Sequence, residues 1–143
     1  KQLLKKLGSN EVIDVESFVS NIKPNLLRAE YDGFIDTIGG DVLVSGLKRL
    51  KFGGAAASAG LVRSQSIDNL TVIPFLMRGI SITGTGAEIA SEWRKEIASQ
   101  YIDKIINDKK ISEITTTISF EDVSKHLKDW EKEKNLGRYV IAF

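Results

Sequence analysis

Hydrophobic residues along the chain switch between the spacing of strands and the spacing of helices. Residues 31–37 form a run that predicts a buried strand, and the glycine pair at 39–40 ends it. From Asp41, a suitable N-cap, apolar residues recur at helical spacing up to residue 50. Residues 55–59 are all small and predict a second strand. The pattern therefore indicates a strand, a helix and a strand in succession.

The second half of the chain continues this alternation. A loop that starts near Gly60 passes through residues 74–76 and leads to a strand over residues 80–83, where β-branched side chains alternate. Residues 88–107 carry the clearest helical pattern, with an apolar residue at every fourth position: Ile89, Trp93, Ile97, Tyr101 and Ile105. The remaining pattern predicts a strand near 113–119, a helix near 121–133 and a terminal strand over 138–143.

The chain opens on a short helix. Leucines at helical spacing lead to Gly8, a natural residue to follow a helix C-terminus, and residues 11–14 then read as a short strand. Pro24 breaks any continuous helix over residues 16–30. Because the first residue is Lys1 and the opening helix begins at once, we expect the chain to be the C-terminal part of a longer polypeptide.

Hydrophobic strands that alternate with helices predict an α/β fold with a doubly wound, mostly parallel sheet. The chain of 143 residues, 42% of them hydrophobic, is long enough to bury one core. It has no internal repeat and no low-complexity segment.

Composition excludes several kinds of function. The 20 basic and 19 acidic residues leave a net charge of +1, which indicates neither a nucleic-acid nor an anionic-membrane partner. The absence of cysteine and the single His126 argue against a metal site. No apolar run approaches the roughly 20 residues that span a bilayer, and the first residues lack the apolar core of a signal peptide. We expect a cytoplasmic protein.

Two glycine-containing segments are candidates for ligand binding. Residues 34–40 place an acid, a hydroxyl and two glycines at the carboxyl end of a strand, where open α/β sheets bind ligands. Residues 53–60 carry almost no bulky side chain, which leaves room for a flat ligand. The plainer interpretations are a strand-to-helix turn for the first segment and tight helix packing for the second.

Other motifs give weaker evidence of function. The sequence from Gly84 to Ile89 departs from the dinucleotide fingerprint, because Ile89 stands where its third glycine belongs, and the chain has no Walker phosphate loop. His126 falls beside the apolar stripe predicted for its helix, which consists of Val123, Leu127 and Trp130, so we interpret it as a solvated surface residue. The serines lack a histidine partner, and the acidic residues show no metal-ligand spacing. No catalytic residue and no metal ligand is predicted.

Five segments, in order along the chain, resemble the zinc-independent medium-chain dehydrogenases/reductases. The branch that the chain resembles is that of the quinone oxidoreductases that include acrylyl-CoA reductase. The segments are Leu4–Gly8, Tyr31–Gly40, Gly53–Leu61, Pro74–Gly79 and Asn135–Arg138.

This resemblance implies a domain organisation. In the family, a Rossmann domain is inserted between two parts of a GroES-like catalytic domain. Residues 1–108 would then be the C-terminal part of the NADP-binding Rossmann domain, and residues 109–143 a strand-helix-strand segment that returns to the catalytic domain. The glycine-rich turn for the cofactor phosphates would lie upstream.

The resemblance also implies contacts with NADP(H), mostly through backbone atoms near the nicotinamide half. The cofactor-binding residues would be Thr37, Gly39, Gly60, Leu61, Leu76, Gly84, Ala87 and Asn135. The chain departs from many family members at Ser58, where they have a cysteine, and at residues 85–88.

The implied activity is NADPH-dependent transfer of hydride to an activated C=C bond or to a quinone, without metal. The piece by itself would be inactive, and the parent protein would form a homodimer through the edge of the Rossmann sheet. The alternative is a non-enzymatic Rossmann-like module that binds a nucleotide or a partner.

Overall fold

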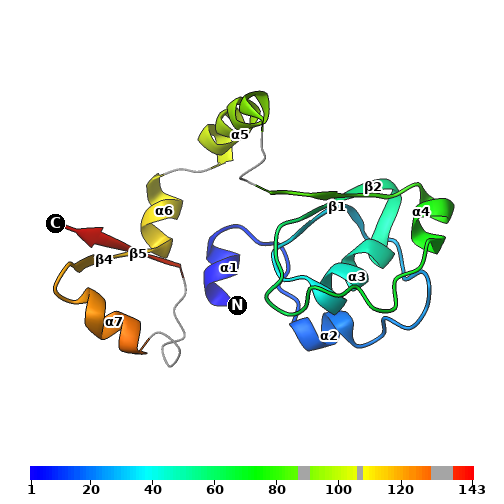
Figure 1. Ribbon diagram of the computed structural model, residues 1–143, viewed down its shortest axis with the longest axis horizontal. Coiled ribbons are helices and arrows are strands. Elements are labelled where there is room, and N and C mark those ends of the chain that lie inside the picture. The colour runs from blue at the N-terminus through cyan, green and yellow to red at the C-terminus, as the bar shows by residue number, and fades with distance from the viewer. Residues whose placement is uncertain (87–90, 106–107, 130–136) are drawn as a thin grey trace. The chain divides into compact units, whose positions relative to one another are not determined.

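A computed structural model describes residues 1–86, 91–105, 108–129 and 137–143, which form two compact units, 1–90 and 91–143. The first unit contains the helices α1 (Gln2–Lys6), α2 (Val15–Val19), α3 (Gly40–Arg49) and α4 (Ile73–Arg78), and the strands β1 (Tyr31–Asp36), β2 (Leu50–Ser58) and β3 (Ser81–Gly84) (Figure 1). The second contains α5 (Glu92–Ile105), α6 (Asp108–Ile114), β4 (Thr115–Ser119), α7 (Val123–Asp129) and β5 (Arg138–Ala142).

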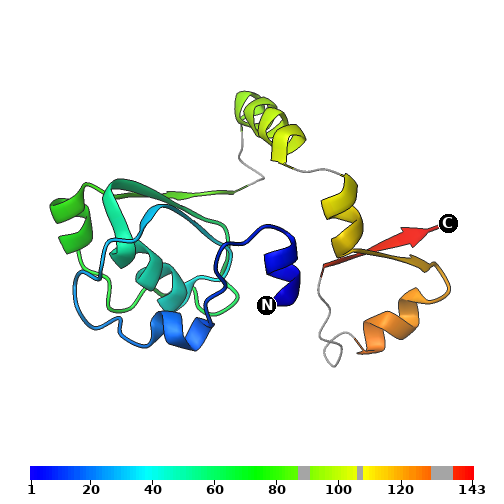
Figure 2. The same ribbon diagram turned by 180° about the vertical axis from the view of Figure 1, so that it is seen from behind.

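The three strands of the first unit form a parallel sheet in the order β1-β2-β3. Parallel neighbours need crossover connections, and α3 and α4 lie in these connections. Both ribbon views show α2 and α3 on the same side of the sheet (Figure 2). This arrangement confirms the predicted α/β architecture with parallel strands.

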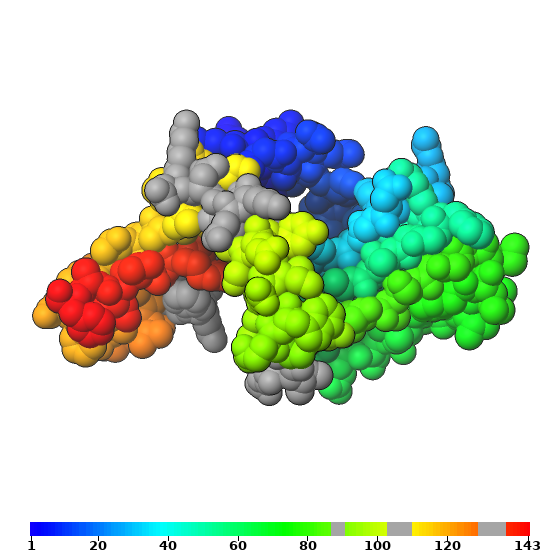
Figure 3. Space-filling model, turned by 90° about the horizontal axis from the view of Figure 1, so that it is seen from above, coloured from blue at the N-terminus to red at the C-terminus, as the bar shows by residue number. Residues whose placement is uncertain are grey.

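The core of this unit lies between α3 and the sheet. It consists of Leu43, Leu47, Leu50, Ala56 and Ile80, with Tyr31, Phe34, Leu70 and Phe75 packed around them. The opposite face of the sheet carries mostly small side chains, and Ile35 on β1 is 79% exposed there. Figure 3 looks from this side, with β2 in the range between cyan and green and β3 in green. The prediction that residues 31–37 form a buried strand is therefore wrong for this face.

Three further predictions are corrected in the first unit. Residues 11–14 form no strand; Asp14 instead caps α2, its carboxylate accepting a hydrogen bond from the Ser17 N–H at 3.4 Å. The N-cap of α3 is Gly39 rather than Asp41. Residues 74–76 belong to a helix rather than a loop, because Pro74 lies in its first turn, where no N–H is needed.

In the second unit, β4 and β5 pair in parallel over all five positions. Of the apolar side chains that predict α5, Trp93, Ile97 and Tyr101 are 59%, 44% and 61% exposed. Ile89, Asn107 and Trp130 lie outside the described residues. The two compact units meet in the sequence between residues 90 and 91, and α5 belongs to the second. The assignment of the two segments to a cofactor domain and a catalytic domain stays a prediction.

None of the helices in the described ranges is long and apolar enough to cross a membrane.

Candidate functional site

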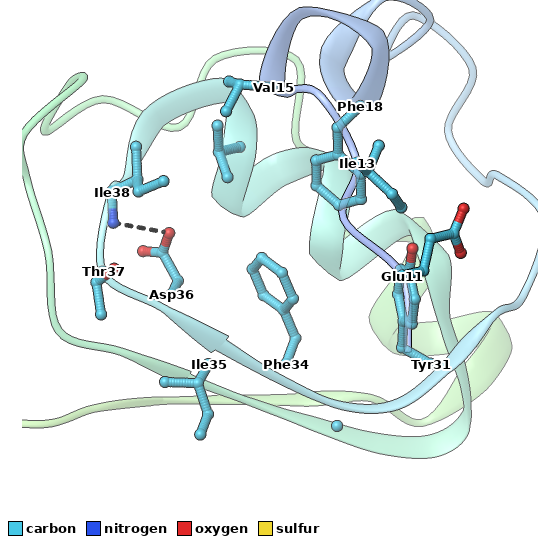
Figure 4. Close-up of a pocket in the computed structure, with 12 residues that line it drawn as sticks. Glu11, Ile13, Val15, Phe18, Tyr31, Phe34, Ile35, Asp36, Thr37 and Ile38 are labelled. Carbon is cyan, nitrogen blue, oxygen red and sulfur yellow. Dashed lines mark hydrogen bonds between the residues drawn. The ribbon is translucent and has the colours of Figure 1, made fainter. Parts of the chain in front are cut away.

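The carboxyl end of β1 is organised by the buried side chain of Asp36, which is 1% exposed. Its Oδ1 accepts hydrogen bonds from the backbone N–H groups of Ile38 at 3.2 Å and Gly39 at 3.0 Å (Figure 4). Its Oδ2 lies 3.1 Å from the same Gly39 nitrogen. An aspartate that accepts from the N–H groups two and three residues ahead fixes a tight turn, and it places its negative charge at the N-terminus of α3.

Two glycines allow this turn to touch the turn that follows β2. Gly39 has φ of +79°, which favours glycine. The α-carbon of Gly60 packs directly on the carbonyl group of Thr37, so that any Cβ at position 60 would overlap it. Gly39 also forms a bridge with Ser64, and the Arg63 N–H donates to the Ile38 carbonyl at 2.9 Å. The ends of β1 and β2 are therefore joined backbone to backbone.

The end of β3 is attached to the same edge through Ser58. The Ser58 carbonyl accepts hydrogen bonds from the Thr85 N–H at 2.9 Å and from the Thr85 hydroxyl at 3.1 Å. The Ser58 hydroxyl donates to Asp36 Oδ2 at 3.2 Å. Hydrogen bonds thus connect the ends of all three strands.

An ion-pair cluster holds the loop after β2. Arg63 Nε lies 2.6 Å from Asp41 Oδ1 on α3, and Arg63 Nη1 lies 3.0 Å from Glu16 Oε1 on α2. The hydrogen bonds to Glu16 and Asp41 raise the pKa of Arg63 above its ordinary value. A polar hollow of about 330 Å³ lies beside this cluster, lined in part by Ser64 and Asp68.

A more apolar hollow of about 350 Å³ runs along β1. Phe34 and Phe18 project into it in Figure 4, with Asp36 near one end and Glu11 near the other. Burial raises the pKa of Tyr31, which also lines the hollow, and the nearby Glu30 raises it further.

The structure brings five of the predicted cofactor-binding residues to one edge of the sheet: Thr37, Gly39, Gly60, Leu61 and Gly84. Leu61 is 70% exposed there. Leu76 lies elsewhere, because α4 is attached to the opposite, amino ends of the strands: Arg78 at its C-terminus donates to the Leu50 carbonyl at 2.9 Å. Ala87 and Asn135 lie outside the described residues.

Sequence reasoning placed Asp36 and Ser58 in the two candidate ligand-binding segments, and Thr85 in the stretch from Gly84 to Ala87 that the resemblance assigns to the cofactor. It did not predict that the three are connected to one another. The signal for Asp36 was present, since an acid at the end of a strand followed by two glycines is typical of such a turn. The partnership with Ser58 depends on strand register, because Asp36 and Ser58 are 22 positions apart and directly opposite in the sheet.

His126 is a correction in the second unit. Its ring lies 4.8 Å from the ring of Tyr139 on β5, and its Nδ1 is buried. Leu127, predicted to face inward, is 66% exposed instead. The helix is therefore turned so that His126 packs on the strand pair rather than lying in solvent. Across the part of the chain that the structure describes, no three His, Cys, Asp or Glu residues come together as metal ligands.

Comparison with known proteins gives similar sequences over nearly the whole chain. YhfP of Bacillus subtilis, named as a quinone oxidoreductase, is 27% identical over 139 residues, which cover 96% of this chain and 42% of YhfP. The acrylyl-CoA reductase AcuI of Ruegeria pomeroyi is 25% identical over 138 residues, with the same two coverages. These matches confirm the predicted resemblance.

Solved structures of such reductases share the fold. The YhdH oxidoreductase of Salmonella enterica, in complex with NADP, superimposes with a TM-score of 0.87 at 25% identity, over 99% of this chain and 43% of that one. YhfP with bound NAD gives the same TM-score and coverages at 26% identity. The chain therefore has the fold of part of these nicotinamide-dependent oxidoreductases. It spans about two fifths of their length, and no family model matches it.

Proposed function

We propose that the natural polypeptide containing this chain is a reductase that uses NADP(H) and passes hydride to an activated C=C bond, as in an enoyl thioester or enone, or to a quinone. The observation that carries this proposal is the edge where the carboxyl ends of β1, β2 and β3 meet in backbone contact. Ligands of open α/β sheets bind at such an edge. The likeness to reductases over 96% of the chain supports the same conclusion.

The residues at this edge fit the nicotinamide end of the cofactor. Gly84 has open space where a Cβ would stand, and Leu61 presents an exposed apolar side chain. Arg63 is the basic residue of these loops, and it forms ion pairs with Glu16 and Asp41. The N-terminus of α3 also lies at this edge, but the Asp36 carboxylate already occupies it. An edge of glycines, backbone groups and one leucine, with no free cation among its described residues, suits a flat, weakly polar ring better than a phosphate.

In this proposal, the bound cofactor supplies the hydride. Thr37, Gly39, Gly60, Leu61 and Gly84 support the ring that carries it, and the close packing of Gly39 and Gly60 against the neighbouring turns excludes water from one side. Ala87 and Asn135 stay proposed contacts from the resemblance alone. No proton donor or metal is proposed for this segment, and the groups on the substrate side are assigned to the rest of the parent protein.

We further propose a homodimer formed through β3. All four residues of β3 are exposed, and the strand is the last of its sheet in the described part of the chain. An exposed sheet edge has unpaired backbone groups that a second copy can pair with. Sedimentation velocity of the natural polypeptide tests this proposal, and a monomer at micromolar concentration would contradict it.

The reductase proposal is tested by titrating the natural polypeptide with NADPH and following NADPH oxidation with acrylyl-CoA, enones and quinones. We expect binding and turnover with at least one class of acceptor, and unchanged activity after treatment with a chelator. Binding without turnover would favour the non-enzymatic nucleotide-binding module. Neither binding nor oxidation would refute the reductase.

A further inference from the structure

We infer that Asp36, Ser58 and Thr85 are positioning residues, which together hold the three strand-end loops at the geometry needed to bind the nicotinamide half of the cofactor. This inference rests on the proposed function. Asp36 and Ser58 are not among the predicted cofactor contacts, and Thr85 falls between the predicted contacts Gly84 and Ala87. In this inference each of the three acts through another residue.

The Asp36 carboxylate is the centre of this network. A buried carboxylate is costly unless its oxygens are hydrogen-bonded, and its bonds are stronger than those between neutral groups. The donors are two backbone N–H groups of its own turn and the hydroxyl of Ser58. The Ser58 hydroxyl is the donor that comes from a different strand. Its removal leaves the turn after β1 formed and takes away the side-chain hydrogen bond from that turn to β2, while the backbone contacts at Gly60 and Arg63 remain.

Ser58 also connects this network to the residue that follows β3. Its carbonyl accepts from both the N–H and the hydroxyl of Thr85, at 2.9 and 3.1 Å. A misplacement of about 1 Å in the groups that hold the reactants is costly to a cofactor-dependent reaction. The network therefore fixes the distance between the turn at Thr37 and the residues after Gly84.

Ser58 and Thr85 lie outside the hydrophobic core, so their positioning role can be distinguished from a contribution to folding. The hydrophobic core consists of side chains from α3, β2 and the residue before β3, and neither Ser58 nor Thr85 belongs to it. Ser58 is only partly buried and Thr85 is exposed. Loss of either hydroxyl is expected to alter the loops more than the stability of the unit.

The test compares S58A, S58C and T85A in the natural polypeptide. Each variant is titrated with NADPH and with 2′,5′-ADP, which represents the adenine half alone, and its Tm is recorded. S58A is expected to weaken NADPH binding about tenfold, because a hydrogen bond to a charged group is lost. A thiol is a weaker hydrogen-bond donor than a hydroxyl, so the NADPH affinity of S58C should lie between those of S58A and the wild type. T85A should weaken NADPH binding about threefold, because the hydrogen bond from the residue 85 N–H to the Ser58 carbonyl remains. Binding of 2′,5′-ADP should be unchanged.

Ser20→Ala is the matched control. The Ser20 hydroxyl likewise donates one hydrogen bond, to the Ser17 carbonyl at 2.9 Å, but it lies at the end of α2. We expect wild-type affinity for both ligands.

The outcomes separate the two proposals. If the wild type binds no NADPH, the proposed function fails, and this inference with it. If the wild type binds NADPH and S58A binds it equally well, the positioning role alone is refuted. Parallel loss of both ligands with a fall in Tm shows a purely structural role and also refutes it. Should S58A fail to fold, T85A decides by the same comparison.

Discussion

Gly60 lies with its α-carbon directly on the carbonyl group of Thr37, although the two residues belong to the turns of different strands. This contact sets how closely the loops after β1 and β2 approach each other. It exists because residue 60 has no side chain, and it brings together two of the residues that the family resemblance assigns to the cofactor.

Replacing Gly60 with alanine should therefore destabilise the protein. The added Cβ overlaps backbone atoms, which cannot move aside as a flexible side chain can, and such overpacking costs about 3 kcal/mol. Thermal and urea denaturation of G60A measure this loss. Gly84→Ala is the control for stability, because its Cβ would meet nothing within 4 Å. Equal stability of the two variants would show that the close approach is absent.

A second close approach lies in the core, between Gly46 on α3 and the ring of Phe34. A Cβ at Gly46 would come within 2.4 Å of the Phe34 ring. Alanine favours a helix by about 1 kcal/mol over glycine, but the overlap outweighs this gain, and we expect G46A to lose about 1–2 kcal/mol net. In the F34L background, where the ring is absent, G46A should cost less stability than it does in the wild type. Additive effects in this double-mutant cycle would contradict the contact.

The two exposed leucines among the predicted cofactor contacts can be separated experimentally. Leu61 is 70% exposed at the carboxyl edge, and Leu76 is 76% exposed on α4 near the amino edge. We expect Leu61→Asp to weaken NADPH binding about tenfold or more, because a carboxylate would face the weakly polar ring. Leu76→Asp should bind as the wild type does. Fluorescence titration of both variants gives the comparison, and the reverse result would place the cofactor at the other end of the sheet.

Lys48 predicts a dependence of stability on pH. Its side chain is buried and donates to the Ile22 carbonyl, and desolvation lowers its pKa from the ordinary 10.5. Between the lowered pKa of the folded state and 10.5, the unfolded chain binds more protons, so stability rises with pH. Below that window, the cost of the buried charge is constant.

The measurement is the free energy of unfolding of the wild type minus that of K48M, as the pH is raised towards 10.5. This difference should increase in favour of the wild type. A difference for K48M that stays flat with pH would show that Lys48 is solvated.

The sequence by itself determined the alternation of strands and helices, since hydrophobic spacing depends only on local periodicity. It also determined the resemblance to the reductases and, through it, the five residues that meet at one edge. The opening helix, β1 and β3 were predicted close to their observed bounds, whereas β2 begins at Leu50 rather than at the predicted residue 55. The strand at residues 11–14 was wrong because a strand requires a partner, which local sequence does not provide.

Tertiary structure alone decided the connections between elements. Ser58 lies opposite Asp36 because β1 and β2 pair in one register, although the two residues are 22 positions apart in the sequence. Only packing shows that Leu76 lies apart from the other predicted contacts, and that His126 rather than Leu127 faces β5. These facts depend on which surfaces meet in space. Residue spacing carries no such information, because a periodic pattern defines a face of an element and leaves open what that face contacts.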